Sequence, residues 1–109
     1  MPEFALVFHS TRSLSPEDLA RRNDAARDWA IARKREGILH SPYPLQDEGF
    51  TVSQGGVNPI TASGAVAAVL IVEAADLSSA VELVKGHPGL AFGTQIDVRP
   101  VKPVVAPQK

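Results

Sequence analysis

The sequence contains no cysteine among its 109 residues. This excludes disulfides, thiolate metal sites and cysteine nucleophiles, and it agrees with the reducing cytoplasm, where we expect the protein to reside. An excess of charge of one sign is also missing, because 11 basic and 12 acidic side chains give a formal net charge of −1. With no basic field to attract a phosphate backbone, nucleic acid is not an expected partner.

Long apolar runs are missing as well. The longest, residues 65–72, falls far short of the roughly 20 residues that cross a bilayer. Residues 1–3 lack the basic start of an export signal, so we expect a soluble, unexported protein with no membrane partner. The chain length is near the commonest domain size, which predicts a single domain.

The first half of the chain predicts a strand followed by a long helix. Residues 3–9 are rich in strand formers. Their alternation places Phe4, Leu6 and Phe8 on one side, and Ala5, Val7 and His9 on the other. The helix begins after Ser15, with Pro16 in its first turn, and ends at Gly37. Its predicted apolar stripe consists of Leu19, Ala26, Trp29 and Ala30.

Short elements follow the helix. Residues 38–43 predict a strand at a sheet edge, because two prolines interrupt its hydrogen bonding. Residues 46–56 predict a turn or small hairpin, and residues 58–61 predict a loop. Residues 66–73 give the strongest strand signal and are apolar on both faces, so both faces need a cover.

The last part of the chain predicts a second helix and a final strand. The helix is capped by Asp76 and stopped by Gly86 and Pro88, and the strand spans residues 94–101. Residues 103–109 predict a flexible tail, so the domain is expected over residues 1–102.

The order of these elements predicts an α+β, ferredoxin-like βαββαβ fold with an antiparallel sheet and two helices on one face. The other face is then bare. Because the strand at residues 66–73 is apolar on both sides, we expect a second copy of the chain to cover that face and form a homodimer.

Several segments resemble the YCII-related family, whose members include the DGPF proteins. The matching segments are L-S-P-E-D-L, D-W-A, G-I-L, P-L, G-F-T-V-S-Q-G-G, V-E-A-A-D-L-S-S-A-V-E-L-V-K-G-H-P-G-L and I-D-V-R-P-V, which cover most of residues 4–101. The resemblance implies a ferredoxin-like fold paired into a dimeric α+β barrel, with a cleft between helices and sheet or at the dimer seam. It also implies that Arg99 matches the arginine of the family's closing R-P-V.

The chain departs from the family pattern at two points. Residues 57–64 are shorter than the stretch that carries the D-G-P-F signature. Asp24 and Ala25 stand where name-giving members carry a histidine in the first helix, so no histidine is carried over.

The candidate catalytic residues are His9 and Asp97. If the first and last strands pair antiparallel, His9 shares the bare face with Asp97 and Arg99 and is a diagonal neighbour of Asp97. Asp97 could then orient the imidazole for proton transfer while Arg99 holds a carboxylate or enolate. The alternative is a network of ion pairs at the dimer interface.

Tyr43 and Arg99 are the candidate ligand-binding residues, although rim or core placement is the simpler prediction for Tyr43 and for Trp29. His87 is predicted to cap the second helix or to be exposed, and His40 to lie on the surface. No metal site is predicted, because three scattered histidines lack ligand spacing.

These patterns favour a dimeric small-molecule-binding domain with acid–base chemistry on an anionic or carbonyl metabolite and no cofactor. Two alternatives stay open. One is a non-catalytic accessory or regulatory dimer module, and the other is a lyase, isomerase or monooxygenase-like enzyme of the kinds that dimeric α+β barrels host.

Overall fold

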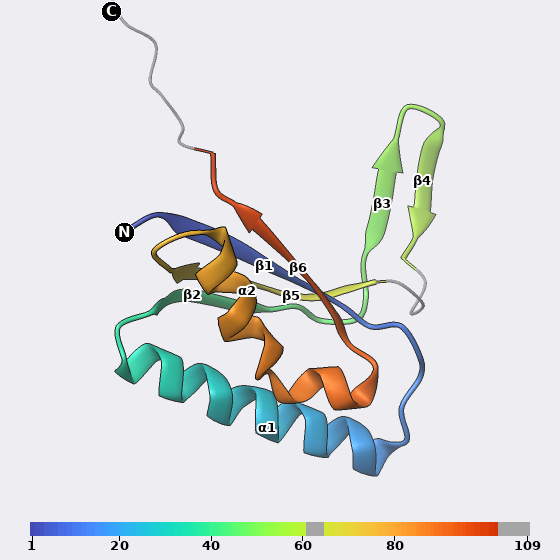
Figure 1. Ribbon diagram of the computed structural model, residues 1–109. Coiled ribbons are helices and arrows are strands. Elements are labelled where there is room, and N and C mark those ends of the chain that lie inside the picture. The colour runs from blue at the N-terminus through green and yellow to red at the C-terminus, as the bar shows by residue number, and fades with distance from the viewer. Residues whose placement is uncertain (61–64, 103–109) are drawn as a thin grey trace, which may run out of the picture.

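The computed structural model describes residues 1–60 and 65–102, so the tail expected at 103–109 lies outside the described residues. The described part is an α+β fold with an antiparallel sheet, a separate β-hairpin and helices packed on the sheet (Figure 1). Its elements are β1 (Glu3–His9), α1 (Pro16–Arg35), β2 (Leu39–Pro44), β3 (Phe50–Ser53), β4 (Gly56–Pro59), β5 (Val66–Glu73), α2 (Leu77–Lys85), the 3₁₀ helix η1 (Pro88–Phe92) and β6 (Gln95–Pro100).

The main sheet has the strand order β2-β5-β1-β6, and every neighbouring pair is antiparallel. The structure therefore confirms the strand predicted at residues 38–43 and its place at an edge of the sheet. An edge strand pairs on one side only, so it tolerates the missing N–H groups of Pro42 and Pro44. Within the described ranges, no helix is long and apolar enough to cross a membrane.

One face of the sheet carries the hydrophobic core. Its buried side chains alternate along β1 and β5 and pack with buried residues of both helices: Phe4, Leu6, Phe8, Leu70 and Val72 from the strands, and Trp29, Ala80 and Val84 from α1 and α2. Both helices thus cover the same face, as the order of the elements predicted. We call this the helix side, and the opposite face, with Ala5, Val7, Val69 and Ile71 half-buried, the open face.

Both predicted helix starts are confirmed by side-chain caps. Ser15 Oγ accepts a hydrogen bond from the Asp18 backbone N–H at 3.1 Å, and Asp76 Oδ1 accepts one from the Ser79 N–H at 2.8 Å. These bonds satisfy N–H groups that a helix cannot pair internally. Gly37 follows α1 with a φ of +76°, the left-handed conformation that glycine adopts without strain.

The prediction of a loop at residues 58–61 is wrong for Asn58 and Pro59, which belong to β4. Pro59 is tolerated because β3 and β4 form a two-stranded sheet, in which each strand has an unpaired side that needs no N–H. Every residue of the two strands is exposed, and the hairpin projects away from the rest of the molecule (Figure 1).

Candidate functional site

A cleft of about 710 Å³ lies between α1 and the helix side of the sheet. Its volume is in the range of small-molecule sites, and most of its walls are apolar. Ala26 and Ala30 of α1 face Leu39 of β2 and Leu70 of β5 across it. The polar lining consists of Ser10, Arg22, Asn23, Asp24, Arg27, Lys34, Asp47, His87 and Thr94. A wall that combines apolar surface with polar groups is typical of ligand sites.

The prediction that His87 caps the second helix or is exposed is wrong, because only 5% of its surface is accessible and its side chain caps η1 instead. After α2 ends, η1 turns the chain back and the imidazole packs edge-on against Phe8 and Trp29, with ring centroids 4.8 and 4.7 Å away. Burial disfavours the charged form and lowers the pKa of His87 to about 4. His87 is therefore neutral at neutral pH.

A backbone hydrogen bond fixes the tautomer of His87. The Gly89 N–H donates to His87 Nδ1 at 2.9 Å, so the proton of the neutral ring is on Nε2. Among the described residues, no hydrogen bond occupies this Nε2–H. The ring thus keeps one donor for a molecule in the cleft that it lines.

Thr94 supplies a second free polar group beside His87. Its side chain is 7% exposed, and its Oγ1 has no hydrogen-bond partner in the described part of the protein. Leaving such a group unpaired costs about 1–3 kcal/mol. A Cβ on Gly89 would come within 3.0 Å of His87 Nδ1 and 3.2 Å of Thr94 Oγ1, so both groups flank this glycine. His87, Gly89 and Thr94 therefore form a polar, closely packed part of the cleft wall, which we call the cleft floor.

Arg22 of α1 also lines the cleft. Its Nη1 donates to Ser10 Oγ at 3.3 Å, and its Nη2 donates to Asn23 Oδ1 at 3.2 Å. Three other arginines of α1 pair with carboxylates one turn away, at 3.7, 3.3 and 2.9 Å. Arg22 has no carboxylate partner among the described residues, and its side chain is only half exposed.

The structure places His9 and Asp97 in contact on the open face. His9 Nε2 lies 2.9 Å from Asp97 Oδ2, although their backbones are diagonal neighbours, since His9 pairs with Gln95 and Val7 pairs with Asp97. The register assumed from the sequence is therefore confirmed, while the catalytic role of both residues stays a prediction. The two side chains are 27% and 61% exposed, so water screens the pair.

Arg99 and Tyr43 lie on the open face but not beside each other. Arg99 pairs with Ala5 on the edge strand β6, and Tyr43 pairs with Val69 on the opposite edge strand β2. Three strand spacings separate these edges, about 14 Å. Arg99 forms no hydrogen bond with His9 or Asp97. It lines a shallow hollow of about 480 Å³ along β6, together with Asp97 and residues of α2.

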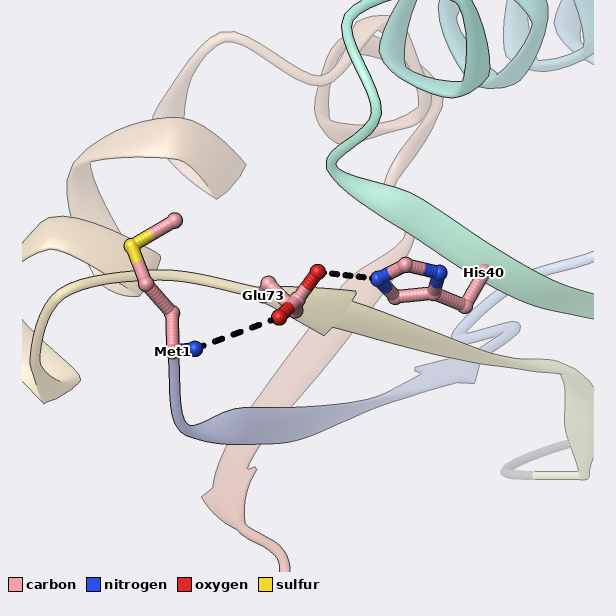
Figure 2. A network of polar contacts seen from close by, with 3 residues as sticks. All are labelled: Met1, His40 and Glu73. Carbon is pink, nitrogen blue, oxygen red and sulfur yellow. Dashed lines mark hydrogen bonds and ion pairs between the residues drawn. The ribbon is translucent and has the colours of Figure 1, made fainter.

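A third histidine, His40, also has a carboxylate partner. His40 Nε2 and the Met1 amino group contact the two carboxylate oxygens of Glu73, the amino group at 3.4 Å (Figure 2). The hydrogen bond from His40 is the main cause that holds the pKa of Glu73 below its ordinary value. This network lies on the surface, as predicted for His40, and joins β2 to β5. In the described ranges, no three His, Cys, Asp or Glu side chains gather as metal ligands.

Sequence reasoning missed the cleft residues His87, Thr94 and Arg22. In the sequence, Arg22 is one of many charged residues on the predicted solvent-exposed face of a helix, and Thr94 is the first residue of a predicted strand. The run Gly86-His87-Pro88-Gly89 signals a helix end followed by a second turn, which was the one available hint. The contact of His87 with Trp29 depends on tertiary folding, and no local pattern encodes it.

No protein-family model matches the chain, and no curated protein matches it at a significant level.

Proposed function

We propose that the protein is a small-molecule-binding domain of the YCII-related type, whose ligand lies in the cleft between α1 and the sheet. The observation that carries this proposal is the buried, unpartnered Oγ1 of Thr94 on the cleft floor, beside His87, whose Nε2–H has no hydrogen-bond partner among the described residues. Buried polar groups are nearly always hydrogen-bonded, so an unpaired one beside a cavity indicates a missing partner.

A thermal-shift screen against metabolites tests this function. A ligand present at 100 times its Kd stabilises the folded state by about 2.7 kcal/mol, which raises the Tm of a domain of this size by several degrees. Ala26 lines the cleft, so Ala26→Phe should fill it and abolish the shift. Ala20→Phe changes an exposed position of the same helix outside the cleft and should keep the shift. Equal shifts in both variants would exclude the cleft.

The same proposal includes a ferredoxin-like fold that pairs through its open face into a dimeric α+β barrel. Support comes from the strand order β2-β5-β1-β6 and from the apolar centre of that face, where Val7, Val69 and Ile71 have no covering layer in the described chain. A second copy would bury this surface by an isologous contact.

Light scattering tests the dimer. The parent chain should have twice the mass of one chain, and Ile71→Glu should halve it, because a charge would be buried at the centre of the interface. Val57→Glu introduces the same charge on the exposed hairpin strand β4 and should leave the mass unchanged. A parent protein that is monomeric at micromolar concentration would refute this part of the proposal.

Acid–base chemistry on the open face is a second candidate function, favoured by the contact between His9 and Asp97. The protein would be incubated with a ligand in D₂O, and NMR would follow the incorporation of deuterium into the ligand. His9→Gln should stop the exchange and keep binding. Exchange that persists in this variant would remove His9 from the chemistry.

A further inference from the structure

Four polar side chains line the cleft near the ends of β1 and β6, those of Ser10, Arg22, His87 and Thr94. The pairing of β1 with β6 ends at His9 and Gln95, both on the open face. The next residues outward are Ser10, which follows His9, and Thr94, which precedes Gln95. Because side chains alternate along a strand, both are expected on the helix side. The two segments stay adjacent beyond that point, because Thr11 Oγ1 donates to the Gly93 carbonyl oxygen.

Ser10 and Thr94 are therefore cross-strand neighbours at one end of the cleft, and both line it. Such neighbours have Cβ atoms about 5 Å apart. Ser10 is joined to the Arg22 guanidinium, while Thr94 is joined through Gly89 to the neutral His87. The cationic pair Arg22 and Ser10 thus lies next to the uncharged pair His87 and Thr94.

We propose that the cleft binds a carboxylic acid that carries a carbonyl or hydroxyl oxygen on the adjacent carbon and a short apolar chain. The carboxylate lies at Arg22 and Ser10, the second oxygen at His87 and Thr94, and the chain between Ala26, Ala30 and Leu70. This inference rests on the proposed function, because it assigns the ligand class of the same cleft.

Each half of the ligand matches the charge of its partners. A guanidinium without a carboxylate partner favours an anion, which it can hold by two parallel hydrogen bonds. A neutral imidazole and a hydroxyl offer no net charge, so they suit an uncharged oxygen. The adjacent positions of the two oxygens in the ligand fit the adjacent positions of Ser10 and Thr94.

Calorimetry with three probes of equal chain length tests the ligand class: 2-oxohexanoate, hexanoate and hexanamide. We expect 2-oxohexanoate to bind about tenfold tighter than hexanoate, which corresponds to one added hydrogen bond, and hexanamide to bind most weakly. Equal affinity for hexanoate and hexanamide would overturn the assignment of the carboxylate, and equal affinity for the two acids would overturn that of the second oxygen.

Two variants assign each oxygen to its residues. Arg22→Gln should abolish the preference for hexanoate over hexanamide, whereas Arg21→Gln, on the same helix and already paired with Asp18, should keep it. Thr94→Val should reduce the affinity for 2-oxohexanoate to that for hexanoate. Its Tm should not fall, since it removes an unpaired hydroxyl. An unchanged oxo-acid preference in Thr94→Val would contradict the proposal.

The outcomes separate this inference from the function beneath it. If none of the probes binds but another compound gives a shift that Ala26→Phe abolishes, the ligand class is wrong and the cleft function stands. If no compound in the screen responds to Ala26→Phe, both are overturned.

Discussion

The two faces of the main sheet are built from the same strands but depend on different interactions. On the helix side, Leu6 and Val72 are fully buried and pack against both helices. On the open face, Val7 and Ile71, one residue away in each strand, stay half-buried. Alternation alone produces this contrast, so the helix side should carry the stability of one chain and the open face should carry the proposed contact with a second copy.

The largest expected effect contrasts neighbouring residues of β1. Leu6→Ala should lower the free energy of unfolding by about 3 kcal/mol, because it removes a buried side chain and leaves a cavity. Val7→Ala should cost less than about 1 kcal/mol in a monomeric background such as Ile71→Glu. Urea denaturation measures both. Equal losses at the two positions would show that the open face is as well packed as the core.

A smaller effect is expected from pH and involves His87. Its pKa is about 4 in the folded protein and 6.5 in an ordinary environment, so between these values the unfolded chain binds a proton that the folded chain does not. The resulting stability is fully present above pH 6.5 and is lost as the pH falls toward 4.

Urea denaturation at pH 7 and pH 5 measures this linkage. The parent should lose more stability between the two values than His87→Gln, in which only the other groups titrate. Carboxylates contribute equally to both proteins, so the difference isolates His87. The same pH dependence in both proteins would mean that His87 is not held neutral by burial.

A still smaller effect is expected for the exposed pair on the open face. A double-mutant cycle on His9→Ala and Asp97→Ala should give a coupling of about 0.5 kcal/mol in monomeric protein, because water screens the pair. If a second copy covers the face, the coupling should grow in dimeric protein. A coupling above about 2 kcal/mol in the monomer would contradict the exposure of this pair.

The smallest expected effect is that of Arg99→Ala. Arg99 lies across the sheet from the cleft and forms no hydrogen bond or ion pair with His9 or Asp97, so stability should change by less than about 0.5 kcal/mol. Ligand binding to the cleft should also persist. Loss of binding with the dimer intact would instead assign the ligand to the open face, and a weakened dimer would assign Arg99 to the interface.

The sequence predicted what depends on local periodicity. The faces of Phe4, Leu6 and Phe8, the contact of His9 with Asp97, and the caps at Ser15 and Asp76 all follow from alternation or from short-range hydrogen bonding. These patterns are encoded within a few residues, and pairing β1 with β6 adds only one assumption of register.

The cleft could not be predicted in the same way. Its floor forms because the turn between α2 and η1 places His87 against Trp29 and Phe8, which are remote in the chain, and because Ser10 and Thr94, just beyond the ends of two strands, line the same cleft. Helix-end signals near Gly86 favoured exposure of His87, and tertiary packing overrode them. The misplaced loop at Asn58 and Pro59 has a simpler cause, since a two-stranded ribbon accepts a proline that a central strand would not.

The β3–β4 hairpin has a consequence for how the protein opens. Its strands pair only with each other and bury no side chain, and such a ribbon is marginally stable by itself in water. Its amides should therefore exchange with deuterium through local fraying, within seconds to minutes, while those of β1 await global unfolding. Chymotrypsin added to the native protein should accordingly make its first cut after Phe50, and the four-stranded body should survive that cut.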